Sequence, residues 1–356
     1  MCNIAGYAGN QQAAPILLEM LRRQQPYDGD MSTGIATIHE GKLHYRKFVG
    51  DVDALIRETD ALSLPGTIGI AHTRPGGKTD EVPMHPNISR NGRMAVVTNG
   101  TTPETQYSPN WSDAVNMLDA DGYRFVHESK EPATVHNLST PHPVLARNGH
   151  MVSPAEARGY LVEYYMERGK TITEALVLAS THMYSDNATV LLSETDPDAI
   201  FALRTTRSLV ANVENGETYM ATTRFGMPDG MGDKAFDLPL FNACKLTRNG
   251  ITVTGDRMDM EPVSENSPAT YKKAYEYFEE LLRSEKAPVN YDKMELTGLQ
   301  MRDEWWDGNH TCIQNARLAY EILWQFEKEG RLQREMRLQD TSFGRPRHRW
   351  YFSLKD

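Results

Sequence analysis

The order of the expected elements most constrains the fold: short apolar strands come first, two helices follow, and strands then return. Apolar runs of strand length, bounded by Gly, Asn and Pro, occupy residues 2–7, 34–39, 67–72 and 94–98. After the helical stretch, further runs of this kind occupy residues 188–193, 199–204, 218–223, 241–246 and 250–254. Strands on both sides of a helical pair favour an α+β fold in which two sheets pack together with helices outside them.

The two central helices carry clear start signals. Ser153, Pro154 and Glu156 supply an N-cap, a first-turn proline and a capping-box glutamate. Thr171 begins a second capping box. Among the later strands, Asn215-Gly216 is typical of a tight hairpin turn. The pattern therefore predicts where both helices begin and where one hairpin turns.

The length of the chain indicates more than one domain. Its 356 residues exceed the ~100–200 residues of a typical domain. The composition changes past residue 260, and Pro268 opens a helix with apolar residues spaced three and four apart. We therefore expect one domain at residues 1–262 and a helical C-terminal unit at residues 263–356.

The end of the chain resembles a winged helix, with a helix at 311–329 and strands at 331–338 and 345–354. Contact with DNA is one interpretation of its basic turn. The net charge of −10 instead favours protein docking or a structural role, and argues against nucleic acid as a partner. The basic residues of the expected wing are Arg345, Arg347, His348 and Arg349.

Cysteine usage and hydropathy indicate the compartment. No run approaches the ~18 consecutive apolar residues of a membrane span, and the N-terminus lacks the basic and apolar regions of a signal peptide. Cys2, Cys244 and Cys312 lack the spacing of a disulfide framework or a zinc site. We expect a cytoplasmic protein with reduced thiols, no membrane contact, no metal and no cofactor.

The chemistry begins at Cys2. Removal of Met1 would leave Cys2 with a free α-amino group, whose pKa of about 8 suits it to accept the thiol proton. Nucleophile and base would then come from one residue. A cysteine at this position has little meaning alone, and chance would explain it.

Four further segments give Cys2 a context. MCNIAGY at 1–7, IAHTR at 70–74, the pair His85-Pro86 and VVTNG at 96–100 occur in order. Their order and spacing resemble those of class II glutamine amidotransferases, such as the glutaminase domain of glucosamine-6-phosphate synthase. PYDGDMSTG at 26–34 is similar to that family's stretch ending in D-S-x-G. Each segment alone has an ordinary structural explanation, but their order makes chance a poor one.

The resemblance implies a fold and a reaction. The fold would be the four-layer αββα sandwich of N-terminal-nucleophile (Ntn) hydrolases. Cys2 would attack a side-chain amide carbon, and the Asn99 side chain and the Gly100 backbone N–H would form the oxyanion hole. Preorganised donors of this kind typically contribute ~2.7–4 kcal/mol each to transition-state stabilisation.

The resemblance also implies a substrate pocket. Arg74 would pair with the substrate's α-carboxylate, for which a guanidinium fork is well suited. Thr73 and His85 would complete the substrate-binding side. His72 and His85 are better explained as packing residues than as catalysts, because the α-amino group already supplies a base.

The sequence departs from the family in the segment after the oxyanion turn. Pro154 stands where the family has an aspartate that holds the substrate's α-ammonium, and the segment 101–152 is longer than the family's. An alternative alignment of residues 125–131 would set Lys130 there instead. Replacement carboxylates for the ammonium could come from Asp113, Asp119, Asp121, Glu128, Glu131 or Glu156. Residues 75–79 also differ, and their glycines fit either a lid or a flexible turn.

Two classes of function remain open. In the first, the chain hydrolyses glutamine or a related γ-glutamyl amide, and ammonia goes to a partner subunit or to solvent, since no sugar isomerase half and no ATP-binding signature is present. In the second, an Ntn domain without turnover serves a regulatory role and the C-terminal unit meets DNA or a protein partner. We also expect the chain to form a homo-oligomer.

Overall fold

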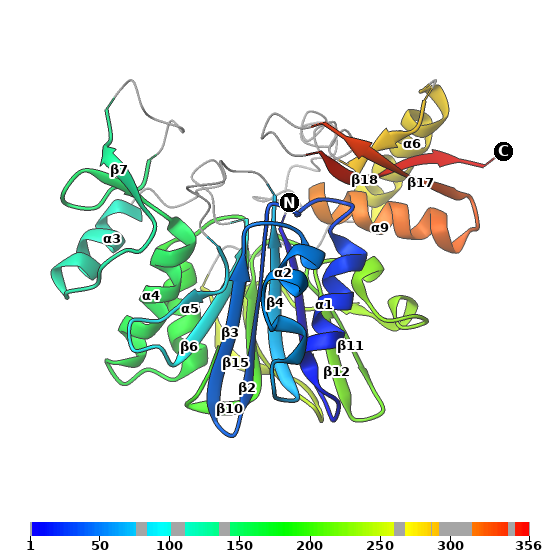
Figure 1. Cartoon of the computed structure of the whole chain (residues 1–356). Helices are drawn as coiled ribbons and strands as arrows, with labels where there is room; N and C mark the ends of the chain where they lie inside the picture. The colour runs from blue at the N-terminus through cyan, green and yellow to red at the C-terminus, as the bar shows by residue number, and fades with distance from the viewer. Residues whose placement is uncertain are drawn as a thin grey trace.

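Two packed antiparallel sheets form the centre of the computed structural model, which describes residues 2–75, 84–100, 111–134, 143–259, 268–285, 287–291, 315–340 and 346–355 (Figure 1). The strands of the first sheet are β1 (Asn3–Ala8), β2 (Ser32–His39), β3 (Lys42–Phe48), β4 (Ile68–Arg74), β11 (Val210–Glu214), β12 (Glu217–Ala221) and β13 (Phe236–Asp237). Their order is β13-β11-β12-β1-β4-β2-β3, so β1 and β4 lie side by side in the interior of the sheet.

The second sheet has six strands in the order β15-β14-β10-β9-β6-β5. These strands are β5 (Asn87–Ile88), β6 (Met94–Asn99), β9 (Ala188–Ser193), β10 (Asp196–Arg204), β14 (Asn242–Thr247) and β15 (Gly250–Arg257). Side chains such as Ile4, Ile70, Val97 and Val190 fill the space between the two sheets. Strands with both faces covered are apolar throughout, which explains why these segments read as continuous apolar runs.

Helices cover both outer faces. The first sheet is covered by α1 (Ala13–Gln24) and α2 (Val52–Glu58), and the second by α4 (Pro154–Met166) and α5 (Ile172–His182). α3 (Trp111–Ala120) packs on α4, near the two-stranded sheet of β7 (Glu128–Pro132) and β8 (His150–Val152). Three short 3₁₀ helices lie in the connections: η1 (Ala61–Ser63), η3 (Arg224–Gly226) and η4 (Gly232–Lys234). The arrangement has four layers, which confirms the α+β prediction of two sheets with helices outside.

Local start and turn signals match the structure in most places. Thr171 and Glu174 form both bonds of a capping box on α5. Asn215 and Gly216 both have left-handed backbones, at φ 55° and 74°, and close the hairpin of β11 and β12 as predicted. α4 begins at Pro154 as expected, yet the Ser153 side chain makes no cap hydrogen bond.

Several elements were not expected from the sequence. β3 reads KLHYRKF and is largely polar, because it is the last strand of its sheet and has no neighbour on its outer side. α1 contains Pro15, which its first turn accommodates because the N–H groups there have no acceptor within the helix. The polar edge strand β3 lacks the apolar pattern on which the sequence argument relied, whereas the three-and-four spacing of Ala14, Leu17, Leu18 and Leu21 in α1 was overlooked.

The described residues of the C-terminal unit form α6 (Pro268–Ser284), β16 (Val289–Asn290), α9 (Asn315–Lys328), β17 (Leu332–Gln339) and β18 (Arg347–Leu354). Its three-stranded sheet has the order β16-β18-β17 and packs on α6 and α9 around Phe278, Phe326 and Phe352. The helix beginning at Pro268 and the two final strands agree with the sequence prediction. The winged-helix prediction also depends on residues 311–314 and Arg345, which lie outside the described residues. In the described ranges, no helix is both long and apolar enough to span a membrane.

Candidate active site

Pairing of β1 with β4 places the start of the chain beside Arg74. β1 begins at Asn3, which lies opposite Thr73 in the register of the two strands. Cys2 therefore precedes one interior strand of the first sheet, and Arg74 ends its neighbour. The Cys2 residue is partly exposed. Figure 1 marks the N-terminus at this end of β4.

The second sheet brings Asn99 and Gly100 to the same place. Asn99 is the last residue of β6, and the backbone N–H of Gly100, the next residue, acts to lower the pKa of the Cys2 thiol. Gly100 has φ 98°, and a Cβ at this position would lie 2.2 Å from the Asp186 carbonyl oxygen, so only glycine fits. Two hydrogen-bond donors, the Asn99 amide and the Gly100 N–H, therefore lie at the end of β6 beside the thiol. The Asn99 amide nitrogen is buried and has no acceptor within the described residues.

Burial of the Cys2 thiol favours its neutral form, whereas the positive charges around it favour the thiolate. Burial raises the pKa of the Cys2 thiol, while the guanidinium groups of Arg74 and Arg207 and the Gly100 N–H act to lower it. Burial also lowers the pKa of Arg74, and the negative charge of the Cys2 thiolate opposes that shift. The thiol is therefore exposed to the positive fields of two arginines, of which the sequence identified only Arg74.

Arg207 and Asp186 are the site residues that the sequence argument missed. Arg207 Nε lies 2.8 Å from Asp186 Oδ2, and the Thr206 hydroxyl donates to the other oxygen of that carboxylate. Arg207 also packs against Gly100, since a Cβ on that glycine would lie 2.8 Å from Nε. The signal was available in principle: Asp186 precedes the strand at 188–193, Arg207 follows the strand at 199–204, and antiparallel pairing brings those flanks together.

His72 and His85 support the site from behind. Their rings stack with centroids 4.1 Å apart. The Thr98 backbone N–H donates to His85 Nδ1 at 3.2 Å, and His72 Nε2 lies 3.0 Å from the Thr98 carbonyl oxygen. Burial lowers the pKa of His72 to about 3 and that of His85 well below its usual value, so both rings are neutral. They join β4 to β6, which agrees with the packing role expected for them.

Thr73 is buried and its hydroxyl accepts a hydrogen bond from the Asn3 side chain at 3.1 Å. A Cβ on Gly34 would lie 2.0 Å from the His85 carbonyl oxygen, so the glycine that ends the PYDGDMSTG segment allows β2 to approach the His85-Pro86 turn. Thr73 and His85, predicted to bind substrate, thus make protein contacts that hold the walls of the site.

The carboxylates proposed to replace the family's aspartate lie in two settings. Glu156 is buried and accepts the backbone N–H groups of Val126 and His127 and the Tyr160 hydroxyl, so it organises the loop before β7. The other carboxylates lie on the far side of α4 from the N-terminus (Figure 1). Asp113 and Asp119 are on α3, Asp121 is in the turn after it, and Glu128 and Glu131 are on β7 together with Lys130. Most of the glycine-containing stretch 75–79 lies outside the described residues.

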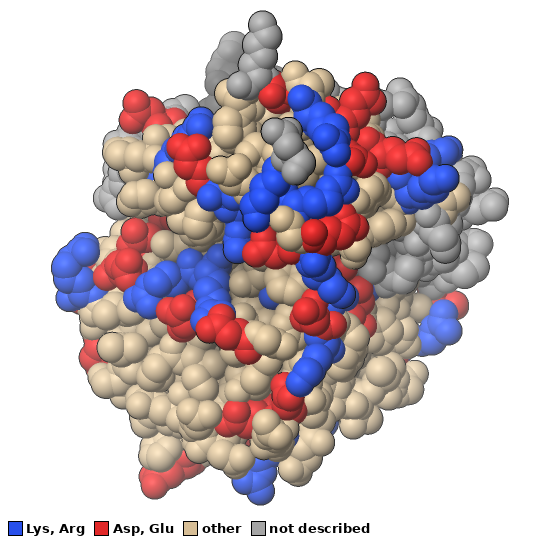
Figure 2. Space-filling view, turned by 90° about the vertical axis from the view of Figure 1, so that its right-hand side faces the viewer, with Lys and Arg blue, Asp and Glu red and all other residues tan. Residues whose placement is uncertain are grey.

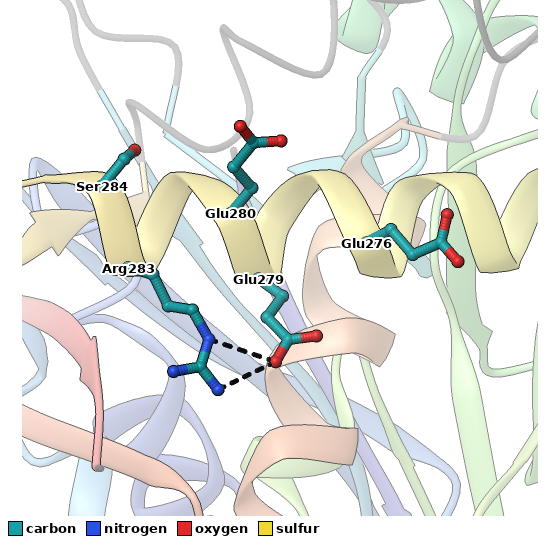
Figure 3. Close-up of a pocket in the computed structure, with 5 residues that line it drawn as sticks. All are labelled: Glu276, Glu279, Glu280, Arg283 and Ser284. Carbon is teal, nitrogen blue, oxygen red and sulfur yellow. Dashed lines mark hydrogen bonds and ion pairs between the residues drawn. The ribbon is translucent and has the colours of Figure 1, made fainter.

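A shallow depression elsewhere has no chemistry of this kind. It has a volume of about 410 Å³ and lies along α6, where Figure 3 shows Glu276, Glu279, Glu280, Arg283 and Ser284. Arg283 donates to Glu279, so its charge is used within the helix. Within the described residues, a thiol, two arginines and the Asn99 and Gly100 donors occur together only at Cys2.

Two antiparallel sheets covered by helices, with a thiol at the start of an interior strand, resemble the fold of N-terminal-nucleophile amidotransferases. Two solved structures share this fold, each with a TM-score of 0.56. One is a glutamine phosphoribosylpyrophosphate amidotransferase from B. subtilis, which is 14% identical and covers 96% of this chain and 69% of its own. The other is an allosteric regulatory enzyme of purine biosynthesis, which is 15% identical and covers 99% of this chain and 71% of its own. No protein-family model matches the chain.

Sequence relatives specify the resemblance further. Glutamine–fructose-6-phosphate aminotransferase (isomerizing) from Caldanaerobacter subterraneus is 32% identical over 62% of this chain and 31% of its own length. The protein of that name from Corynebacterium efficiens is 33% identical over 64% of this chain and 34% of its own length. The chain thus resembles the glutaminase region of a class II glutamine amidotransferase, and it spans about a third of the length of these relatives.

Proposed function

We propose that the chain hydrolyses the side-chain amide of glutamine, or of a related γ-glutamyl compound, and releases ammonia through a Cys2 thioester. The observation that carries this proposal is the buried Asn99 amide nitrogen, which has no acceptor in the described residues and lies one residue before Gly100, whose backbone N–H lowers the pKa of the Cys2 thiol. A buried donor without a partner costs about 1–3 kcal/mol in the folded protein. A developing oxyanion would supply the missing acceptor.

The proposed reaction uses the residues around Cys2 in sequence. After loss of Met1, the α-amino group of Cys2 takes the thiol proton, and the sulfur attacks the amide carbon. Asn99 and Gly100 donate to the carbonyl oxygen as it becomes an oxyanion. The tetrahedral intermediate collapses, the nitrogen takes the proton from the α-ammonium group, and ammonia leaves a thioester. Water then attacks the thioester, which yields the free carboxylate and restores the thiol.

Arg74 and Arg207 would act on charge. Arg74 ends β4 beside Cys2 and would hold the substrate's α-carboxylate through two parallel hydrogen bonds. Arg207, held by Asp186, would stabilise the thiolate. With Pro154 in place of the family's aspartate and Glu156 used by the loop before β7, discrimination for a free α-amino group should be weaker than in relatives that keep that aspartate.

The remaining parts of the proposal concern organisation. We place the domain boundary between residues 262 and 263, since the core of the C-terminal unit draws its buried residues from positions 274–352, with Tyr27 and Phe225 as the two contributed from the other side of the boundary. The C-terminal unit is proposed to be of winged-helix type on its order of helix, strand, helix and two strands. Ammonia would go to an acceptor subunit or to solvent, and the chain would act as a homo-oligomer in the cytoplasm.

The test uses glutamine with hydroxylamine as the trap. Wild type should release glutamate and ammonia and should form γ-glutamyl hydroxamate, the expected product of a thioester. Cys2→Ala should lose both activities. Cys244→Ala is the matched control, because Cys244 is a buried thiol on β14 outside the site and its loss should leave hydrolysis intact. Hydrolysis that survives Cys2→Ala at a comparable rate would assign the chemistry to another group.

A further inference from the structure

The loop of residues 25–31 backs the proposed substrate-binding strand. The Met31 N–H donates to the Arg74 carbonyl oxygen at 2.9 Å, and the Asn3 side chain donates to the Asp28 carbonyl oxygen. Gly29 has φ 101°, and a Cβ there would lie 2.7 Å from the Thr73 hydroxyl oxygen. The loop therefore touches both the residue after Cys2 and the strand end that carries Arg74.

Two arginines of β18 hold the opposite side of this loop. Arg349 reaches Asp28 Oδ1 at 3.3 Å through Nη2 and Asp30 Oδ2 at 3.2 Å through Nη1. Arg347 Nε lies 3.2 Å from the other oxygen of Asp30. The two arginines are only 7% and 2% exposed, so these ion pairs are shielded from water and sensitive to loss of either partner.

Backbone and aromatic contacts complete the attachment. The Trp350 N–H donates to the Pro26 carbonyl oxygen at 2.9 Å. Tyr27 is buried, with its ring centroid 4.9 Å from that of Phe225 and 5.8 Å from that of Phe352, and Arg334 donates to its hydroxyl at 3.3 Å. The loop is thus inserted into the core of the C-terminal unit while its glycine faces Thr73.

We infer that Arg347 and Arg349 are positioning residues for the amide site, and that the C-terminal unit forms the outer wall of that site through Asp28 and Asp30. The inference rests on the proposed function where glutamine is concerned. It also assigns two of the basic residues of the expected wing, Arg347 and Arg349, to an intramolecular contact. On the face of the molecule in Figure 2, Lys and Arg are interspersed with Asp and Glu and form no field of one sign.

The experiment compares two thiol reagents of similar size, iodoacetate and iodoacetamide, with the label mapped to Cys2 by peptide mass. Only iodoacetate carries a carboxylate, so the ratio of the two rates reports whether Arg74 faces the thiol. Arg74→Ala sets the scale for complete loss of that attraction. The test variants are Arg349→Ala and the isosteric Asp30→Asn, which keeps the side-chain volume if the first variant folds poorly. Arg337→Ala is the control, because Arg337 lies on the neighbouring strand β17, partly exposed and paired with Glu335.

We expect Arg349→Ala and Asp30→Asn to lower the rate ratio by up to about 10-fold, toward the Arg74→Ala value, while the iodoacetamide rate stays the same. The KM for glutamine should rise by about 10-fold with kcat within about 3-fold, a split that general destabilisation would not produce. Arg337→Ala should resemble wild type in both measurements.

Two results would overturn the inference: wild-type ratios in both test variants, or a wild-type ratio in Arg74→Ala itself. If wild type fails to hydrolyse glutamine, the proposed function fails, but the reagent ratio still decides the positioning role. If hydrolysis depends on Cys2 but the rate ratio and the KM are the same in Arg349→Ala and Asp30→Asn as in wild type, only the positioning role is refuted.

Discussion

Replacement of Asn99 by leucine should separate catalysis from stability. Asn99 is 1% exposed, and its amide nitrogen has no acceptor within the described residues. An apolar side chain of similar shape removes a desolvation cost of about 1–3 kcal/mol. A donor to an oxyanion typically contributes about 10²–10³-fold to kcat. Asn99→Leu should therefore lower kcat by about 10²–10³-fold, while the free energy of unfolding stays constant or rises by up to about 2 kcal/mol.

A second buried amide provides the opposite control. Gln24 is fully buried, donates to the carbonyl oxygens of Ile4 and Met20, and accepts the Thr222 N–H at 3.1 Å. Gln24→Leu should lower the free energy of unfolding by about 1–3 kcal/mol and leave kcat within about 3-fold. Urea unfolding measures the first quantity and coupled detection of glutamate the second. If Asn99→Leu keeps its kcat, or loses as much stability as Gln24→Leu, the oxyanion role of Asn99 is refuted.

Four further predictions test the site. Protein that retains Met1 should be inert because the α-amino base is missing, as intact mass combined with an activity assay would reveal; full activity with Met1 present would exclude the mechanism. Arg207→Ala should raise the pKa of the Cys2 thiol, since a stabilising cation is lost, and should move the pH profile of iodoacetamide labelling at Cys2 upward; an unchanged profile would remove Arg207 from the site. Arg74→Ala should raise KM for glutamine in steady-state assays, with Arg74→Lys recovering only part, because lysine lacks the guanidinium fork; full recovery would argue against bidentate binding. The pKa of His72 is lowered to about 3 in the folded protein, against about 6.5 in the unfolded chain, so the unfolded chain binds an extra proton between these pH values. The free energy of unfolding should therefore decline as the pH falls from about 6.5 toward 3. Urea titrations should find a smaller decline in His72→Gln than in wild type, and an equal decline would contradict a buried neutral ring.

Local features of the fold could be predicted because their causes lie within a few residues of one another. The capping box at Thr171, the first-turn proline of α4 and the turn at Asn215-Gly216 depend on backbone groups at most four positions away. The apolar strands were recognisable because burial on both faces removes polar residues from them. The edge strand β3 escaped prediction because one-sided pairing leaves it polar.

The catalytic candidates divide along the same line. Cys2 and the Asn99-Gly100 turn were identified from short segments, and they meet because β1 begins at the edge of the sandwich where β6 ends. Asp186 and Arg207 were not identified, because neither belongs to a segment with a recognisable pattern. Glu156 illustrates the converse, since a carboxylate that the sequence left available is used by the backbone of Val126 and His127.

The sequence by itself determined the class of fold and the order of the segments around position 2, and it predicted Cys2 as the nucleophile, because apolar periodicity, turn chemistry and short motifs are properties of adjacent residues. Only the tertiary structure decided which distant charges meet. Arg349 is separated from Asp28 by more than 300 positions, and whether its guanidinium faces solvent, DNA or the loop behind Arg74 depends on how the C-terminal unit packs against the first domain. A basic turn has the same composition in each case, so its role is set by burial and by its partner, which no local pattern encodes.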